Sequence, residues 1–504
     1  MRMKTKIIAA AALVILLFAA ACGDGPGGAG EKDSDSPAGG GNAGAGETEQ
    51  QPGDENKRIE SAAPVKDFGG YEFRVLSRNE AATRWYARDI TTESETGDPF
   101  NDAVYRRNVA IEDRYNIKII NRMAASDALL TEARKSISSG GDDYDILKGG
   151  LSGFATSLSM EGMLLDLKNV PYLDLPKPWY DQKANVQLTV ANKLYVTISE
   201  ISTIDKDATW AYLFNKKLVA DLSLENPYQL VRDGEWTIDK MLALCKDVSR
   251  DLDGDGAMGR GDLYGYAGET WNLYFGLMSA GHALIQKDAG DLPVYTGLDD
   301  AGLGSFNKLI SMFGDKNLVL RADDWYGKGF DVWIDLMDVA FTENRVLLFD
   351  TSMARVQLYR DMEADFGIVP PPKRDAAQKE YISNLTVFWT NSLAIPATAG
   401  DAERTGAITD ALAAESLYTV IPAYYDIQLK TKLARDDESS EMLDILFAGR
   451  NFDLGMIYNW GGMGDKFADA MQRNSPDIVS ALEKIQDRIA GEITKTIEAY
   501  ESYS

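Results

Sequence analysis

Residues 71–76, YEFRVL, open the pattern that decides the fold. Polar and apolar side chains alternate along this stretch, which predicts a β-strand. Two more strands are predicted over residues 116–120 (NIKII) and 144–147 (YDIL), with a helix over 126–138 between them. An earlier helix is expected to begin after the capping residue Asp98, with Pro99 at its first position. This β-α-β-α-β order predicts parallel strands with right-handed crossovers, and hence an α/β fold.

The loops that follow these strands are the first candidates for ligand contact. In open parallel sheets, ligands meet the loops at the carboxyl ends of the strands. The loop over residues 77–90 carries Arg84 and Trp85, and the loop over 148–154 begins with Lys148 and two glycines. We therefore expect Arg84, Trp85 and Lys148 near a bound ligand.

The N-terminus has the features of an export signal. Three basic residues in the first six positions precede an apolar run over residues 7–21, which is short for a transmembrane span. The sequence Ala19-Ala20-Ala21-Cys22 resembles a bacterial lipobox, in which Cys22 becomes the acylated N-terminus. Residues 1–21 are thus predicted to be a lipoprotein signal peptide, with several acyl chains, palmitate among them, giving stable anchoring to the bacterial cell membrane. The alternative is a plain secretory signal with an incidental cysteine.

Residues 22–65 are predicted to be a flexible tether. They are rich in Gly, Ala, Asp, Glu and Ser and contain almost no large apolar side chain. Such a segment cannot bury enough surface to offset the entropy of ordering it. The tether would separate the lipid from an extracytoplasmic body of about 440 residues, which is long enough for two domains.

Charge and composition exclude several classes of function. The formal net charge of −26 argues against nucleic-acid binding and against broad docking on an anionic membrane surface. Membrane contact is therefore expected through the lipid alone. With Cys22 acylated, Cys245 has no partner for an internal disulfide, and its apolar neighbours predict a buried thiol. His282 is the single histidine, which excludes internal multi-histidine metal sites and favours a satisfied structural role.

Residues 251–262, DLDGDGAMGRGD, have the spacing of an EF-hand calcium loop. Asp251, Asp253, Asp255 and Asp262 occupy positions one, three, five and twelve, and the carbonyl of Ala257 occupies position seven. Converging oxygens of this kind suit a hard cation, so we expect structural calcium. Because residues 263–266 (LYGY) read as a strand, an isolated loop is predicted instead of a paired sensor hand. An ordinary Gly/Asp surface turn is the alternative.

Several motifs along the chain resemble one family. YDIL at 144–147 is followed by a glycine-rich loop and by MEGMLLDL at 160–167, and then come NKLYV at 192–196 and WAYLFNKKL at 210–218. Their order and spacing resemble those of the extracellular solute-binding proteins of ABC importers, in the sugar-binding group related to maltodextrin-binding proteins. The similarity spans most of residues 66–504. The chain departs from the family at Asn192, where a glycine is usual, and in lacking the proline that normally follows this motif.

The resemblance implies a monomer with the two-lobed, type II periplasmic-binding-protein fold, in which the chain crosses the hinge more than once. The first lobe would comprise residues 66–203 and 388–415. The second would comprise residues 204–387 and 416–504, including the calcium-type loop. The first crossing is expected near residues 200–207 and the second within 381–396.

The resemblance also implies residues that face a cleft between the lobes. Carboxylates and amides there would accept hydrogen bonds from sugar hydroxyls, and aromatic rings would stack on sugar faces. The candidates are Glu200, Ser202, Glu269, Trp271, Asp350, Ser352, Trp389, Asn459 and Trp460. Glu200 is equally consistent with a solvated strand end, Trp271 with a core position and Trp460 with a packing role.

The resulting hypothesis is a lipid-anchored receptor that captures a mono- or oligosaccharide and presents it to an ABC permease without covalent chemistry. The alternative is an anchored glycoside hydrolase or lyase that uses paired carboxylates such as Glu269 and Asp350. A third possibility is a surface lipoprotein that has lost its ligand. The sequence contains neither a phosphate-binding GxxxxGK[ST] loop nor a GxSxG nucleophile elbow.

Overall fold

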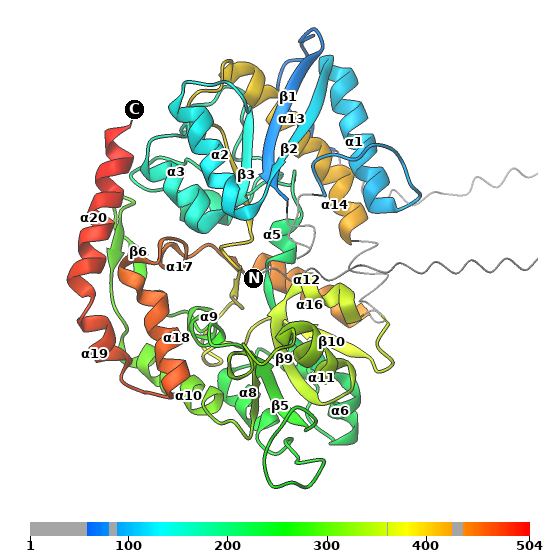
Figure 1. Cartoon of the computed structure of the whole chain (residues 1–504), viewed down its shortest axis with the longest axis vertical. Helices are drawn as coiled ribbons and strands as arrows, with labels where there is room; N and C mark the ends of the chain where they lie inside the picture. Colours follow the sequence, from blue (N-terminus) through cyan, green and yellow to red (C-terminus); the bar gives the residue numbers. More distant parts are fainter. Residues whose placement is uncertain (1–57, 80–87, 360, 426–436, 504) are drawn as a thin grey trace, which may run out of the picture. The chain divides into compact units, whose positions relative to one another are not determined.

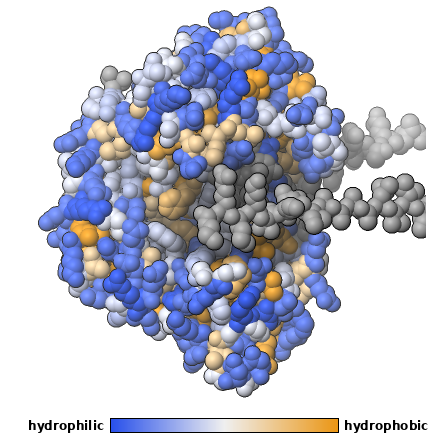
Figure 2. Space-filling view, viewed as in Figure 1, coloured by the Kyte–Doolittle hydropathy of each residue, from blue (hydrophilic) through white to orange (hydrophobic). Residues whose placement is uncertain are grey.

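The computed structural model describes residues 58–79, 88–359, 361–425 and 437–503. Two separate sheets organise this part of the chain, and Figure 1 shows each with its own helices. The predicted signal peptide, Cys22 and most of the tether lie outside the described residues, as do Arg84 and Trp85. Among the described helices, none combines the length and apolarity needed to cross a bilayer. The face drawn in Figure 2 is mainly hydrophilic, with scattered hydrophobic residues.

The first sheet has four strands in the order β12-β3-β1-β2. Strand β1 pairs in parallel with β2 on one side and β3 on the other, which confirms the predicted parallel arrangement. β12 returns from late in the sequence and pairs with β3 in antiparallel fashion. The bounds are β1 Tyr71–Arg78, β2 Ile117–Ala124, β3 Ile146–Gly150 and β12 Asn391–Ala394.

Local signals place the helices of this first sheet. Asp98 accepts a hydrogen bond from the amide of Asn101, so α1 begins at Pro99 as predicted. Helix α2 spans the predicted residues 126–138, and α13 packs against α1. The helices up to the first crossing, with the late ones that follow β12, are α1 Pro99–Tyr115, α2 Ser126–Ser138, α3 Thr156–Met160, α4 Gln182–Leu188, α5 Ile204–Asp207, α13 Ala402–Tyr418 and α14 Val420–Ala423.

The second sheet has five strands in the order β10-β4-β9-β5-β8. β5 is parallel to both β8 and β9, whereas β4 is antiparallel to β9 and to β10. Strands β4, β5 and β9 are buried along their whole length, as expected for a sheet covered on both faces. The bounds are β4 Trp210–Asn215, β5 Tyr264–Gly268, β8 Val319–Arg321, β9 Val346–Ser352 and β10 Phe366–Val369.

The rest of the chain forms mainly short helices, and its last two helices follow each other over residues 478–483 and 486–502. Two small strand pairs, β6 Ile285–Lys287 with β7 Pro293–Tyr295 and β11 Ser383–Asn384 with β13 Arg450–Asn451, complete the strands. The remaining helices are α6 Lys216–Asp221, α7 Pro227–Arg232, α8 Ile238–Cys245, α9 Asn272–Ser279, α10 Asp300–Phe313, α11 Asp338–Thr342, α12 Met353–Val356, α16 Asp437–Ala448, α17 Leu454–Tyr458, α18 Met463–Arg473, α19 Ile478–Glu483 and α20 Gln486–Ser502.

The chain passes between the two sheets more than once. It leaves the first sheet after β3 and enters the second through α5 and β4, then returns between β10 and β12. After α13 it goes back to the second sheet, where α16 packs against β10. The isolated bridge between Thr209 and Leu385 joins the first two passages. These repeated passages are the arrangement that the two-lobed fold requires.

Cys245 and the single histidine, His282, both lie in the protein interior. Cys245 is completely buried, and burial raises the pKa of its thiol far above the usual value. His282 is also buried, with Nε2 at 3.0 Å from the hydroxyl of Ser305. Both predictions, a core thiol and a satisfied histidine, are confirmed.

The close approach of α13 to the backbone of Pro171 gives a test of packing. A Cβ at Gly406 would lie 2.0 Å from the carbonyl oxygen of Pro171, whereas a Cβ at Gly304, on α10, would meet open space. We expect Gly406→Ala to lower the free energy of unfolding by about 1–3 kcal/mol through overpacking. Gly304→Ala should raise it by about 0.5–1 kcal/mol, because alanine favours a helix interior over glycine. Urea unfolding of both variants measures whether each substitution lowers or raises the free energy of unfolding. If Gly406→Ala did not lower it, the close packing of α13 would be contradicted.

Candidate ligand-binding site

A cavity of about 620 Å³ lies at the carboxyl-terminal edge of the parallel strands β5 and β9. β4 runs antiparallel to β9, so its first residue, Trp210, reaches the same edge. Residues 386–389, on the return passage between the sheets, supply the wall opposite. The volume lies within the range of small-molecule sites. The lining residues are Trp210, Glu269, Asp331, Trp333, Ile334, Asp338, Thr342, Thr351, Ser352, Ala354, Arg355, Leu358, Tyr359, Thr386 and Trp389.

A smaller cavity of about 180 Å³ continues this one. The two share Trp210, Glu269, Thr386 and Trp389, which therefore stand between them. The smaller cavity is completed by Trp271, Phe275, Val387, Phe388, Met456 and Asn459. Together the two cavities can hold a ligand that spans several rings.

Five of the residues predicted from sequence line this joint cavity, namely Glu269, Trp271, Ser352, Trp389 and Asn459. They come from four distant parts of the chain. Trp210, Trp333, Arg355 and Thr386 also line it but were not predicted as ligand residues. A sequence signal for Trp333 existed in the aromatic cluster of residues 325–333 just before the strand that carries Ser352.

Three predicted residues lie inside the protein instead. Asp350 is 1% exposed and accepts a hydrogen bond from Tyr266 at 2.5 Å, beside the cavity and not in its lining. Lys148 ends up fully buried on β3.

Trp460 is the third of these residues. It is 3% exposed, stacks on Tyr458 with ring centroids 4.6 Å apart and donates from Nε1 to the hydroxyl of Thr496 at 3.0 Å. The packing alternative therefore describes its position, because both its face and its polar atom are already used within the protein.

The carboxylate of Glu269 differs from the two other carboxylates of the lining, those of Asp331 and Asp338, which accept hydrogen bonds within the protein. It accepts no hydrogen bond and forms no ion pair with any residue that the structure describes. Burial, followed by the negative charges of Asp323 and Asp350, raises the pKa of Glu269 to about 7, and the positive charge of Arg355 opposes that rise. A carboxylate in this state favours a ligand that supplies hydrogen-bond donors or positive charge.

Two of the cavity's tryptophans, Trp333 and Trp389, each lie against an arginine. The Arg78 guanidinium lies 5.0 Å from the centre of the Trp389 ring and donates to the carbonyl of Phe388 at 2.8 Å. Arg355 lies 4.9 Å from the Trp333 ring centre, and its Nε donates to Asp338 at 3.0 Å. Cation–π contacts of this kind fix the ring planes. Because Arg78 is the last residue of strand β1, the first sheet helps to position the side chain of Trp389 in the cavity.

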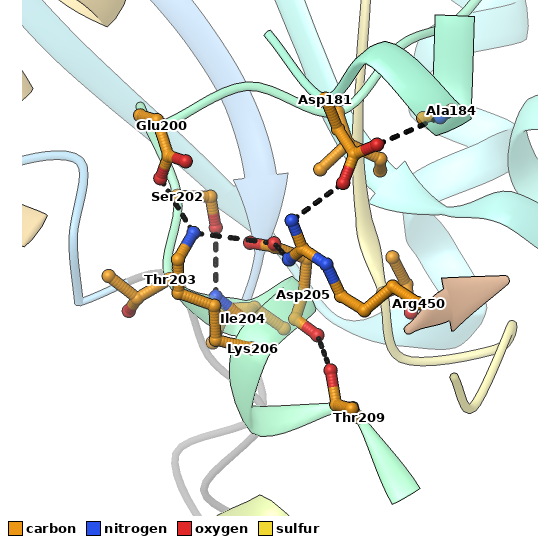
Figure 3. A network of polar contacts seen from close by, with 12 residues as sticks. Asp181, Ala184, Glu200, Ser202, Thr203, Ile204, Asp205, Lys206, Thr209 and Arg450 are labelled. Carbon is orange, nitrogen blue, oxygen red and sulfur yellow. Dashed lines mark hydrogen bonds and ion pairs between the residues drawn. The ribbon is translucent and has the colours of Figure 1, made fainter. Parts of the chain in front are cut away.

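Glu200 and Ser202 belong to the first passage between the sheets and do not line the cavity. Ser202 donates to Asp89 at 2.7 Å. Figure 3 shows Glu200 turned toward Lys206, with Nζ at 2.6 Å from its carboxylate. Lys206 also lies 3.5 Å from Asp205.

Arg450 completes this buried ionic network. Its guanidinium pairs with Asp205 and, at 2.6 Å, with Asp181, the residue that caps α4 (Figure 3). Burial alone would raise the pKa of Asp205, but Lys206 and Arg450 outweigh burial and hold that pKa below its usual value. Burial alone would lower the pKa of Lys206, but the negative charges of Asp205 and Glu200 outweigh burial and raise that pKa above its usual value. Burial raises the pKa of Glu200, and the positive charge of Lys206 opposes that rise.

The calcium-type loop brings its carboxylates together. Ligand atoms of Asp251, Asp253 and Asp255 lie within 4.8 Å of one another. Asp262 is buried and accepts hydrogen bonds from the amides of Leu252 and Gly259, so it braces the two ends of the loop. The strand expected after the loop is β5. Ala257 has its amide bonded to Asp255 at 2.8 Å. Calcium binding itself stays a prediction.

Comparison with known proteins finds solved structures with the same fold but finds no close relative by sequence. No protein-family model matches the sequence, and no curated protein matches it either. Many solved structures do match. An ABC substrate-binding protein from Listeria monocytogenes, in complex with cycloalternan, is 13% identical with a TM-score of 0.55, over 84% of this chain and 99% of that chain.

Two other solved structures are similar to this chain over most of its length. The cyclic α-maltosyl-1,6-maltose binding protein from Arthrobacter globiformis is 15% identical with a TM-score of 0.55, over 85% of this chain and all of that one. An ABC transporter solute-binding protein from Thermotoga lettingae, bound with α-D-tagatose, is 16% identical with a TM-score of 0.51, over 85% and 100%. The chain therefore has the two-lobed type II fold of ABC solute-binding proteins, and these neighbours are binding proteins, not enzymes.

Replacement of Arg450 tests the ionic network. Arg450→Met would leave Asp181 and part of the charge of Asp205 buried without a cation, so the free energy of unfolding should fall by about 3–5 kcal/mol. Arg488→Met removes an exposed pair with Glu492 four residues along α20 and should cost at most about 0.5 kcal/mol. Urea unfolding at neutral pH compares the two. Equal effects would mean that the buried network contributes no more than a surface pair.

Proposed function

We propose that this protein is a receptor that binds a carbohydrate in the joint cavity. The observation that carries the proposal is that four tryptophans, Trp210, Trp271, Trp333 and Trp389, line the cavity together with the partner-free carboxylate of Glu269. Indole faces pack well against the apolar faces of sugar rings, and a carboxylate accepts hydrogen bonds from their hydroxyls. The fold is shared with proteins solved with cycloalternan and α-D-tagatose, which supports the same ligand class here.

Capture would proceed by closure of one sheet and its helices against the other. The cavity receives side chains from the second sheet and from the return passage, so a hinge motion at the passages changes its width. We infer that the closed form then delivers the solute to an ABC permease. No bond need form or break. Of the two carboxylates considered for an enzyme, only Glu269 lines the cavity, which favours binding over hydrolysis.

We further propose that Cys22 carries lipid and that residues 22–65 tether the binding body outside the cytoplasm. The support is the sequence pattern alone. Metabolic labelling with palmitate should mark the wild-type protein and not Cys22→Ala. Labelling of both would overturn the anchor.

Binding is tested by calorimetry and thermal unfolding of the mature protein against a panel of mono- and oligosaccharides. A cognate sugar at 100 times its dissociation constant should add about 2.7 kcal/mol to stability, with no product formed. Trp389→Ala should weaken binding by tenfold or more, about 1.4 kcal/mol, because it removes a stacking face. Tyr172→Ala, which removes an exposed ring outside the cavity, should leave affinity unchanged. Absence of a response to every sugar would contradict the carbohydrate proposal, and turnover would favour an enzyme.

Calcium is proposed as a structural ligand of residues 251–262, on the convergence of Asp251, Asp253 and Asp255. Chelation should lower the midpoint of thermal unfolding, and calcium should restore it, because bound metal fastens the loop to β5. A dissociation constant of about 10⁻⁴–10⁻³ M would suffice outside the cell. The double variant Asp253→Asn, Asp255→Asn should not respond to either. If chelation left the midpoint of the wild-type protein unchanged, the calcium proposal would be wrong and the loop would be an ordinary Gly/Asp turn.

A further inference from the structure

The joint cavity has an excess of negative charge. Among the described residues, its acidic lining consists of Glu269, Asp331 and Asp338, and its one basic side chain is Arg355. Arg355 is already paired with Asp338 through both carboxylate oxygens. The positive charge in the lining is therefore already paired within the protein, and these residues offer an anionic ligand no unpaired cation.

Glu269 lies among further negative charge. Asp323 accepts two hydrogen bonds from Thr270, the next residue along the chain, and Asp350 lies in the sheet beneath. Burial and then these two charges raise the pKa of Glu269, and burial and then Glu269 raise the pKa of the neighbouring Tyr326. An ionised, half-buried carboxylate beside two others is an unfavourable arrangement unless it takes up a proton or a cation joins it.

The aromatic side chains that flank Glu269 suit such a cation. Trp210 and Trp389 line both cavities together with Glu269. Indole is the strongest cation–π partner among the side chains, and Trp389 already accepts the Arg78 guanidinium on its ring. A carboxylate with adjacent indoles is a site for an ammonium group. The chain's net charge of −26 would also attract cationic solutes.

We propose that the solute is a saccharide bearing a protonated amine, whose ammonium group pairs with Glu269 beside Trp210 and Trp389. This inference rests on the proposed carbohydrate-binding function and specifies its ligand class. The hydroxyls and ring faces of the sugar would use the remaining lining, including Ser352 and Asn459. A neutral sugar would fill the same space but would leave the charge of Glu269 without a counter-ion.

Matched ligands test the amine directly. Calorimetry at pH 7.5 would compare glucosamine with glucose, galactosamine with galactose, and the β1,4-linked glucosamine disaccharide with cellobiose. The amino form of at least one pair should bind tenfold or more tighter. Its affinity should also fall by close to tenfold per pH unit between pH 6.5 and 5, because Glu269 must lose a proton to pair with it. Neutral sugars should show no such slope.

A charge-removing variant identifies the residue. Glu269→Gln keeps the shape and should weaken the amino sugar at least tenfold, flatten the pH slope and change a neutral sugar by less than threefold. Glu498→Gln removes the same charge from an exposed position on α20, outside the cavity, and should change neither. Thermal unfolding at pH 7.5 checks folding, and Glu269→Gln should be at least as stable as wild type because it relieves the repulsion.

Each remaining outcome decides between the two proposals. Neutral sugars that bind as tightly as their amino forms would overturn the cationic ligand and leave the carbohydrate receptor standing. Binding of spermidine without any saccharide, neutral or amino, would overturn both, and so would the absence of any binding. Retention of amino-sugar affinity in Glu269→Gln would overturn the assignment of the ammonium group to this residue.

Discussion

Asp205 carries a buried negative charge at the point where the chain leaves the first sheet, and the geometry of the molecule depends on how that charge is neutralised. Lys206 supplies one cation from the adjacent residue, and Arg450 supplies the other from nearly 250 residues further along. Removing charges from water is costly, so the pairs must be complete to persist. The network consequently joins the first passage to the cap of α4 and to β13.

The position of the cavity follows from this junction. Five residues after Asp205, β4 begins at Trp210, whose side chain is part of the cavity wall. Residue Leu385, bridged to Thr209, precedes the return passage that carries Trp389. Arg78 then secures Trp389 from the end of β1. Both sheets thus contribute to one site through their passages, which makes the site sensitive to any hinge motion between them.

The sequence predicted the parts of the structure that local chemistry controls. The capped start of α1, the bounds of α2 and the parallel strands of the first sheet required only caps and hydrophobic periodicity. Glu269 and Ser352 were implied by the family resemblance, and the structure places them at the carboxyl ends of β5 and β9. Trp210 and Arg355 were missed because their exposure to the cavity depends on strand order in the second sheet. That order mixes parallel and antiparallel neighbours, which single-strand patterns do not encode. Residues 80–87 lie outside the described structure, so Arg84 and Trp85 stay predictions.

Satisfaction of hydrogen bonds distinguishes two carboxylates that otherwise look alike. Glu269 and Asp350 were both candidates, and burial raises the pKa of each to about 7. Asp350 receives the hydroxyl of Tyr266 within the sheet, so its partner is part of the protein. Glu269 has no such donor among the described residues and lines both cavities. Because an ionised group without a partner in a half-buried site is unfavourable, Glu269 holds its charge at a free-energy cost that a proton or a cationic ligand relieves. That asymmetry, more than the acidity of either residue, marks Glu269 as the ligand's anchor.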